Sequence, residues 1–454
     1  MKFLRRFLFV VFAAVILIAI FVGLNLIPVD DTPYQQTDFY RQTTARLSQL
    51  PAPAKPQKPL SAGWAKVNMT PGFTTPTGGY GVRRGKHWTT VHDSIFARAI
   101  LLDNGSNRVA LVSLDLLIIP PTVVEQLKRR LPKLGLRWEQ VYMGATHSHN
   151  SLGGWAPGVV GTLIAGDFEQ RIVDHLTNTV LNAIRQAGQQ LEPVSVGYAE
   201  TPAPELVYNR LHDNGPEDDR VRVLQLRKQS GQVALVTSFA AHSTIINSDI
   251  SDWLSRDWPG VLVDDLEKQP GHFALYMAGA VGSMGPTETG PTEDAQLHFI
   301  ADSLAAKIRN VLPTMQSKPD SMLALLTLPV TLRDAHVRVS DGWRLRPWVF
   351  TKIYGDYPSE IKALRIGQTV LLGMPADFSG ELVMNLTRET ARVGLNGMIT
   401  SFNGGYIGYI TPDAYYHETR YETRDMNWFG PQNGAYFDEL SRKLVQKLSQ
   451  PYKR

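Results

Sequence analysis

Apolar, β-branched runs that alternate with segments of helical periodicity constrain the fold of this chain more than any other feature. Strands that are covered by helices on both faces are typically apolar almost throughout. Runs of this kind span residues 108–117, 141–145, 233–239, 273–278 and 368–373. Helical patterns separate several of them, at residues 121–134, 168–187, 258–269 and 295–311. This alternation predicts an α/β fold, with a large mixed sheet as its core and helices covering the sheet.

Polar residues of the types that bind metals or act in catalysis follow these strands at or near their carboxyl ends. They are Asp115, His147, His149, His242 and Asp377. Ligands of open α/β sheets bind outside the carboxyl ends of the strands, so we expect a functional site at this edge of the sheet. Any one of these residues taken alone could instead form a turn or cap a helix. Asp377, for example, is a favoured cap for a helix expected over residues 378–389.

The segment Gly144-Ala-Thr-His-Ser-His-Asn-Ser-Leu-Gly-Gly154 carries two histidines spaced by two. Because side chains alternate faces along an extended backbone, both imidazoles can point the same way. Neutral imidazole is the commonest protein ligand for a transition metal. On its own, the pair fits equally well a polar strand end whose histidines bond to the backbone. The chain has no cysteine, so a metal site here uses His, Asp, Glu and Tyr, and no disulfides form.

The N-terminus carries an uninterrupted apolar run from Phe7 to Leu24, long enough to cross a bilayer as a helix. Lys2, Arg5 and Arg6 precede it, which predicts a cytoplasmic N-terminus. The alternative is a cleaved signal peptide, but residues 24–28 offer no small-residue cleavage motif. We therefore expect residues 1–27 to be a single-pass anchor in the inner (cell) membrane, with the rest of the chain on the periplasmic side.

A spacer and one large domain are expected after the anchor. Residues 28–60 are predicted to form the spacer, because residues 50–59 are rich in proline and favour an extended conformation; a short helix is expected over residues 38–47. Residues 61–454 show no second linker and are expected to form one large domain or two interleaved lobes. The composition of the chain is that of a globular protein, with 43% apolar and 19% charged residues. The net charge of +4 and the lack of a basic stripe argue against a nucleic-acid partner.

A series of short motifs runs through residues 65–435. It comprises Lys66-Val-Asn-Met-Thr-Pro71, Gly79-Tyr-Gly81, Val91-His-Asp-Ser-Ile-Phe-Ala-Arg-Ala-Ile100, Val109-Ala-Leu-Val-Ser-Leu-Asp115, Ala145-Thr-His-Ser-His149, Gly153-Gly154, Tyr208-Asn-Arg210, the His242 segment, Pro375-Ala-Asp-Phe-Ser-Gly-Glu381, Gly408-Tyr-Ile-Thr-Pro412 and Arg420-Tyr-Glu422. No single motif is specific. In number and order, however, they resemble the large N-terminal catalytic domain of the neutral/alkaline non-lysosomal ceramidases.

This resemblance implies a zinc ion (Zn2+) at the carboxyl ends of the strands. The family binds catalytic zinc through two histidines, an acidic residue and a tyrosine. The positions that match in this chain are His147, His242, Asp377 and Tyr409. Two imidazole nitrogens, one carboxylate oxygen and one phenolate form a donor set that suits zinc.

Three further residues match positions that act on the substrate in that family. Arg210 resembles the arginine that faces the polar group of the substrate, and Tyr421 resembles the tyrosine that stabilises the developing oxyanion. His149 would contact the substrate or shuttle a proton to the leaving amine. Each has a simpler alternative: Arg210 could pair with an acidic residue at 217–219, and Tyr409 and Tyr421 could be packing or surface aromatics.

The chain departs from the family pattern at several positions. Asp377 stands where the family usually has glutamate, and Ser283 stands where it usually has aspartate. Ala278 and Gly279 are nearest to the position of a family serine, which is absent. We therefore expect attack by water activated at the metal. The chain ends at Arg454, so no C-terminal immunoglobulin-like domain is expected.

The predicted function is that of a neutral ceramidase-like amidohydrolase, which uses zinc to cleave ceramide-like N-acylated lipids in sphingolipid metabolism. Two alternatives remain open. One is a zinc hydrolase of another amide, because a fold and a metal site do not fix a substrate. The other is a membrane-tethered lipid-binding protein with a decayed site. The departures from the family pattern at Asp377 and in the 279–286 segment support this alternative.

Overall fold

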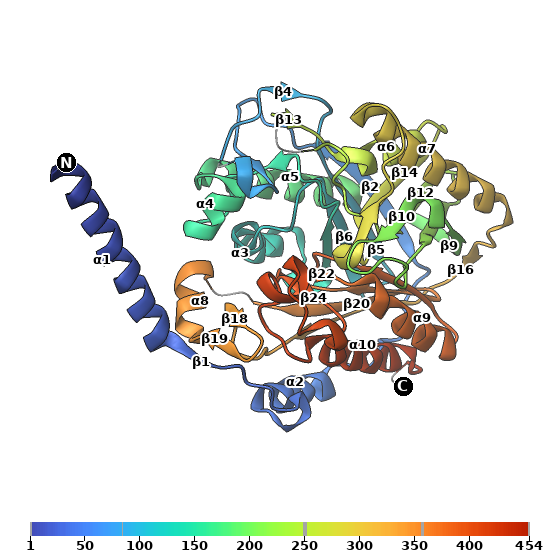
Figure 1. The fold of residues 1–454 in the computed structure, drawn as a ribbon. Coiled ribbons are helices and arrows are strands. Elements are labelled where there is room, and N and C mark those ends of the chain that lie inside the picture. The colour runs from blue at the N-terminus through green and yellow to red at the C-terminus, as the bar shows by residue number, and fades with distance from the viewer. Residues whose placement is uncertain (1, 84, 248–251, 356–357, 453–454) are drawn as a thin grey trace.

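Two sheets lie at the centre of the molecule, as a computed structural model of the chain shows (Figure 1). The structure describes residues 2–83, 85–247, 252–355 and 358–452. The larger sheet has nine strands and the smaller has four, and both contain parallel and antiparallel pairs. The expected α/β fold with a large mixed sheet and covering helices is therefore confirmed.

The larger sheet runs in the order β14-β12-β11-β9-β2-β5-β6-β7, with β16 beside β9. Its strands are β2 (Ser61–Asn68), β5 (Phe96–Asp103), β6 (Arg108–Leu114), β7 (Val141–Ala145), β9 (Glu192–Pro202), β11 (Arg220–Lys228), β12 (Val233–Phe239), β14 (His272–Ala278) and β16 (Lys318–Pro319). The smaller sheet consists of β17 (Leu323–Pro329), β20 (Glu360–Ile366), β21 (Thr369–Gly373) and β23 (Asn396–Thr400), in that order.

Helices cover the outer faces of the two sheets (Figure 1). The longer ones are α3 (Pro121–Arg130), α5 (Gln170–Gly188), α6 (Asp257–Leu266), α7 (Glu293–Val311), α9 (Val383–Arg392) and α10 (Asn433–Ser449). Two shorter helices are α4 (Val159–Ala165) and α8 (Pro347–Tyr354). Short pairs of strands join the loops: β3 (Thr77–Gly78), β4 (Thr90–Val91), β8 (Ser151–Leu152), β10 (Val207–Asn209), β13 (Trp253–Leu254), β15 (Met284–Pro286), β18 (Arg338–Ser340), β19 (Trp343–Leu345), β22 (Asp377–Phe378) and β24 (Tyr409–Ile410).

The larger sheet curls so that its two edges approach each other. The Ser113 hydroxyl of β6 donates to the Tyr276 carbonyl oxygen of β14 at 2.5 Å. A Cβ on Gly144 of β7 would lie 3.1 Å from the Met277 sulfur of β14. Since β6 and β7 are parallel, as are β12 and β14, the carboxyl ends of both pairs open into one region.

The smaller sheet packs against one face of the larger sheet. Leu224 and Val236 of the larger sheet share one apolar cluster with Leu364, Leu371 and Met398 of the smaller sheet. All of these side chains are buried, as the continuous apolar runs of their strands predict. The parallel strands β21 and β23 thereby bring their carboxyl ends beside those of β7 and β12.

The N-terminal segment is attached to the body without a free linker. Helix α1 (Lys2–Asn25) is long and apolar enough to span a membrane or to serve as a signal anchor. It continues directly into β1 (Leu26–Pro28), which pairs with β19. Within the segment expected to be a spacer, α2 (Asp38–Gln49) lies over the C-terminal part of the body, where Tyr34 and Tyr40 donate to the Glu439 carboxylate at 2.7 Å.

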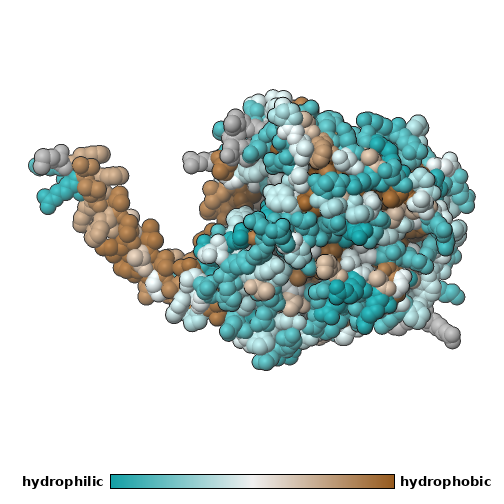
Figure 2. Space-filling view, turned by 45° about the vertical axis from the view of Figure 1, so that its right-hand side comes forward, coloured by the Kyte–Doolittle hydropathy of each residue, from teal (hydrophilic) through white to brown (hydrophobic). Residues whose placement is uncertain are grey.

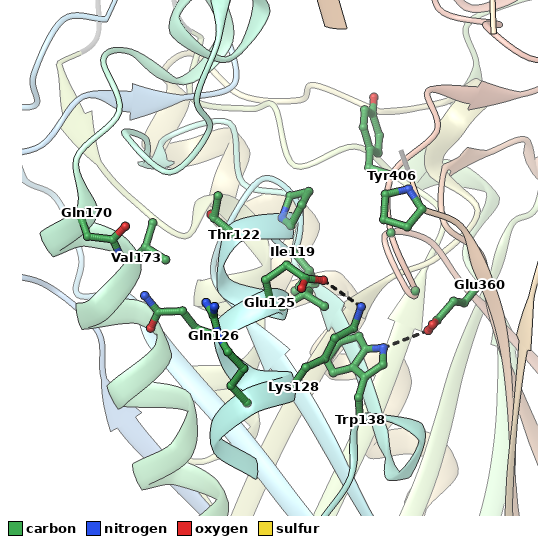
Figure 3. Close-up of a pocket in the computed structure, with 16 residues that line it drawn as sticks. Ile119, Thr122, Glu125, Gln126, Lys128, Trp138, Gln170, Val173, Glu360 and Tyr406 are labelled. Atoms are coloured by element: carbon green, nitrogen blue, oxygen red, sulfur yellow. Dashed lines mark hydrogen bonds and ion pairs between the residues drawn. The ribbon is translucent and has the colours of Figure 1, made fainter. Parts of the chain in front are cut away.

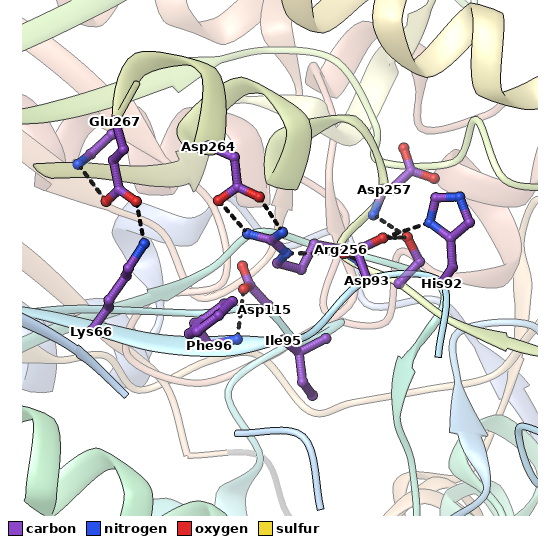
Figure 4. Close-up of polar contacts among 12 residues, drawn as sticks. Lys66, His92, Asp93, Ile95, Phe96, Asp115, Arg256, Asp257, Asp264 and Glu267 are labelled. Carbon is purple, nitrogen blue, oxygen red and sulfur yellow. Dashed lines mark hydrogen bonds and ion pairs between the residues drawn. The ribbon is translucent and has the colours of Figure 1, made fainter. Parts of the chain in front are cut away.

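A buried ionic network lies behind the His147–His149 loop (Figure 4). The Arg256 backbone N–H and Nε donate to Asp93 at 2.9 and 3.0 Å, and its guanidinium also pairs with Asp264. The adjacent Ser255 carbonyl accepts from the Ser148 hydroxyl at 2.6 Å. The network therefore fixes the chain segment on which the histidine loop rests.

We expect Asp93→Asn to lower the free energy of unfolding by about 2 kcal/mol, because Arg256 is buried and loses a charged partner. Asp264→Asn is the matched control, since Asp264 pairs with the same arginine but is half exposed. It should cost less than about 1 kcal/mol. Urea denaturation of both variants measures the difference. Equal losses would show that burial of the partner does not decide the contribution.

Candidate metal centre

Two imidazoles converge where the carboxyl ends of β7 and β12 meet. The Nδ1 atom of His147 lies 2.7 Å from the Leu117 carbonyl oxygen, and that of His242 lies 3.0 Å from the Met284 carbonyl oxygen. Because a carbonyl only accepts, each Nδ1 carries the proton. Each Nε2 therefore presents a lone pair to the interior. The hydrogen bond from Nδ1 to the carbonyl oxygen fixes the orientation of the ring, as such bonds do in known metal sites.

Asp377 faces both of these lone pairs. Its Oδ1 lies 3.5 Å from the Nε2 atoms of His147 and His242. Two ligands of a tetrahedral zinc ion, each about 2.1 Å from the metal, lie roughly 3.4 Å apart. Asp377 is in the short strand β22, and α9 begins only at Val383. The alternative in which Asp377 caps a helix is therefore excluded.

Unpaired polar atoms in the interior show that this centre fits a cation. The Oδ1 of Asp377 and the Nε2 of His242 are both buried and have no hydrogen-bond partner among the described residues. An orphaned buried polar atom is costly, and here two of them point at each other with the His147 lone pair beside them. Three electron-rich atoms in one small space are the donor set that a divalent metal requires.

His149 completes a group of three histidines that can hold a metal ion. Ligand atoms of His147, His149 and His242 lie within 4.8 Å of one another. The Nε2 of His149 is 3.1 Å from the Nε2 of His147, and its Nδ1 is buried without a partner. Since the His147 atom is an acceptor, His149 donates through Nε2 and keeps a free lone pair on Nδ1.

Arg210 reaches the centre through Tyr409. The Arg210 guanidinium donates to the Tyr409 hydroxyl at 3.0 Å, and Tyr409 pairs with Asp377 across the strands β22 and β24. Arg210 forms its ion pair with Glu422 at 3.1 Å, and not with the acidic residues at 217–219. Tyr409 is buried, and its hydroxyl accepts from Arg210, so it does more than pack against other aromatics.

Tyr421 borders the centre from the solvent side. Its ring centroid is 5.8 Å from that of Tyr409, in an edge-to-face arrangement. The side chain is 55% exposed, whereas His147, His242, Asp377 and Tyr409 are all buried. Tyr421 therefore lies on the solvent side of Tyr409.

Burial sets the protonation of these groups. It lowers the pKa of His147 to about 3 and holds those of His149 and His242 well below the ordinary value. Burial also raises the pKa of the Asp377 carboxyl and, together with that carboxyl, raises the pKa of Tyr409 well above its usual range. At neutral pH all three imidazoles are therefore neutral, which is the form that binds metals.

Two residues that support the centre were not predicted from the sequence. The Tyr406 hydroxyl donates to Asp377 Oδ2 at 2.8 Å, so that Oδ1 is left to face the histidines. The ring of Phe402 stacks on His147, with centroids 4.0 Å apart and an angle of 11°. Both residues lie in the glycine-rich loop that follows β23. The only signal for them was the proximity of this loop to Tyr409 in the sequence.

A separate cavity of about 460 Å³ lies on the outer side of the same loop (Figure 3). It is bounded by α3, by residues 404–406 and by Trp138, whose indole N–H donates to Glu360 at 3.0 Å. None of the residues predicted for the metal or for catalysis lines it. The cavity and the histidine centre share only Tyr406, which lines the cavity and donates to Asp377.

The segment that departs from the family pattern packs tightly beneath the centre. A Cβ on Gly279 would lie 2.8 Å from the Phe239 carbonyl oxygen, so the backbone here leaves no space for a side chain. The Ser283 hydroxyl donates to Glu381 and accepts from the Gly380 backbone N–H. Ser283 is thus engaged in holding the β22 loop and does not point at the histidines.

Comparison with known proteins gives two findings. The sequence model of the neutral/alkaline non-lysosomal ceramidase family, N-terminal region, matches residues 62–292, just over half of the chain. The fold is similar to the crystal structure of neutral ceramidase from Pseudomonas aeruginosa, with a TM-score of 0.76 and 19% identity over 88% of this chain and 76% of that one. A structure of ceramidase complexed with C2 gives the same score and identity, over 88% and 77% of the chains. From the extent of the sequence match, the chain belongs to the neutral/alkaline non-lysosomal ceramidase family.

Proposed function

We propose that this protein is a zinc-dependent hydrolase that cleaves the amide bond of ceramide-like N-acylated lipids. Membership of the ceramidase family supports a hydrolase. The observation that carries the proposal further is the convergence of Asp377 Oδ1 with the Nε2 atoms of His147 and His242, at 3.5 Å and without other partners for Asp377 Oδ1 and His242 Nε2. This arrangement suits a cation, and two nitrogens with one carboxylate oxygen match the preference of zinc.

We assign the metal to His147, His242, Asp377 and Tyr409. Tyr409 is the adaptable member, because its hydroxyl accepts from Arg210 and must lose its proton to ligate, while burial raises its pKa well above the usual range. A second set, with His149 as third nitrogen ligand, is also compatible with the spacing of the histidines. Zinc content of a His149→Ala variant distinguishes the two sets, since only the second predicts its loss.

The chain's own residues divide the catalytic work. Bound zinc supplies a Lewis acid that polarises a carbonyl and acidifies water. His149 carries a free Nδ1 lone pair at the centre, so it can accept a proton from water and pass it to the leaving amine. Tyr421 and Arg210 can donate hydrogen bonds to the carbonyl oxygen as negative charge develops. No side chain at Gly279 offers a nucleophile, which favours direct attack by water.

We further propose that α1 anchors the enzyme in the inner membrane, with the catalytic body on the periplasmic side. The helix is apolar from Phe7 to Leu24 and is exposed on the structure, so that lipid suits its surface. The basic residues Lys2, Arg5 and Arg6 favour retention of the N-terminus in the cytoplasm.

Zinc binding is tested by the double variant His147→Ala/His242→Ala. We expect the wild type to retain about one zinc per chain and the variant to retain almost none, because two of the ligands are removed. Mass spectrometry of metals in the purified proteins measures the content. His175→Ala is a control, since this histidine lies on α5 and bonds to the Met69 carbonyl oxygen. Unchanged zinc in the double variant would refute the assignment.

Hydrolysis is tested with N-acyl lipids of varied chain length and head group, with release of the free amine as the readout. We expect turnover that chelation abolishes and that added zinc restores. Turnover confined to other amides would support the alternative substrate class. Stoichiometric zinc binding, or lipid binding, without any turnover would support a protein whose site has decayed.

Removal of the hydroxyl from Tyr421 and from Tyr409 is expected to have different effects on rate and on zinc binding. Tyr421→Phe should lower kcat and kcat/KM together by about a hundredfold with zinc retained, because an oxyanion donor acts only as charge develops. Tyr409→Phe should instead weaken zinc retention under mild chelation, and added zinc should restore part of the rate. Kinetics and metal titration of both variants measure this. If both lose zinc equally, or Tyr421→Phe keeps full rate, the two roles are wrong.

A further inference from the structure

An exposed apolar surface lies beside the anchor helix. Short helices α4 and α8 contact each other, and both leave large apolar side chains in solvent. We call this the α4–α8 surface, which consists of Val82, Val159, Leu163, Trp343, Trp348 and Ile353. In Figure 2, brown side chains gather on the edge of the body that faces α1. Contiguous exposed apolar patches of this kind mark interaction sites.

The attachment of α1 determines what this surface meets. Asn25 ends the helix, and its carbonyl oxygen accepts from the Arg346 backbone N–H at 2.9 Å. The Trp348 indole donates to the Asn25 side chain at 3.1 Å, and its ring lies against Phe21 at 6.0 Å. Because no flexible linker separates α1 from α8, a bilayer that α1 crosses lies within a residue or two of α8.

The chemistry of the surface also fits a bilayer interface. Exposed tryptophans such as Trp343 and Trp348 favour the headgroup level of a membrane. Arg346 and Lys352 are exposed beside them and carry positive charge, which suits anionic headgroups. Where a helix crosses a bilayer, lipid always lies beside the end of the helix. A protein partner need not lie there, so lipid is the partner that this position favours.

The α4–α8 surface is also connected to the histidine centre. Gly79 donates to the Ile164 carbonyl oxygen of α4 at 3.2 Å, and the adjacent Tyr80 ring packs on His149 at 4.7 Å. On the other side, Tyr354 of α8 packs on Trp428 at 5.2 Å, and Trp428 packs on Tyr406, which donates to Asp377. The surface is therefore connected to the histidine centre from two directions.

We propose that the α4–α8 surface seats on the lipid bilayer that α1 crosses, so that the Tyr421 side of the site faces the membrane and a lipid substrate enters from the bilayer. The part of this inference that concerns the substrate rests on the proposed hydrolysis. The seating rests on the proposed membrane anchor, on Trp348 and on the exposed side chains, and not on the hydrolysis.

The absence of cysteine allows a direct test in the full-length protein. Single variants Val159→Cys and Met384→Cys carry a fluorophore at residues that are 66% and 53% exposed. Met384 lies on α9, away from α4 and α8, and is the matched control (Figure 1). In proteoliposomes with doxyl-labelled lipid, we expect strong quenching at residue 159 and little at residue 384. Equal quenching at both residues would overturn the seating, as would protection of residue 159 by a second copy of the chain.

Activity gives a second readout. Val159→Glu/Leu163→Glu places two charges on exposed positions, so the fold should be retained. We expect kcat/KM for an N-acyl lipid in the bilayer to fall about tenfold, while a water-soluble short-chain analogue is cleaved at the normal rate. Met384→Glu should change neither. A loss on both substrates would refute entry from the bilayer. If the wild type cleaves neither, the proposed function fails and the quenching result still decides the seating.

Discussion

The buried contact between Asp377 Oδ1 and His242 Nε2, 3.5 Å apart and both without a hydrogen-bond partner among the described residues, is the constraint on which the centre depends. The carbonyl contacts of His147 and His242 commit both Nδ1 atoms to donation, so both Nε2 atoms turn lone pairs toward Asp377. Without a cation, burial raises the pKa of Asp377 and suppresses protonation of the imidazoles. Asp377 Oδ1 and His242 Nε2 thus carry a desolvation cost that no hydrogen bond among the described residues offsets. A bound metal would convert this cost into binding free energy, as metal centres do in general.

The curl of the larger sheet and the packing of the smaller sheet against it together bring His147, His242 and Asp377 to one place. His147 and His242 come from strands near the two opposite edges of the larger sheet, and Asp377 follows a strand of the smaller one. None of these elements could bring the three residues together alone. The ionic network around Arg256 then holds the histidine loop from behind, because Ser255 bonds to both Ser148 and Asn150.

Sequence patterns predicted the strands and the strand-end residues, since both depend on local periodicity and order. They failed where long-range pairing decided the outcome. Residues 377–378 pair with residues 409–410 as strands, so the helix expected from 378 begins at Val383. Asp115 was expected among the site residues, but its carboxylate accepts from the Phe96 backbone N–H and faces the Arg256 network (Figure 4). No local pattern reveals which way such a side chain turns.

The short Asp377 side chain and the backbone of residues 279–286 are linked by geometry. An aspartate carboxylate reaches the histidines only if its backbone lies close to them. Gly282 permits this approach, because a Cβ there would be 2.6 Å from the Asp377 carbonyl oxygen. Ser283 then anchors the following loop by accepting from the Gly380 backbone N–H. A side chain at residue 282 would push the Asp377 backbone away, so the distance of 3.5 Å from Asp377 Oδ1 to both imidazole nitrogens depends on this glycine.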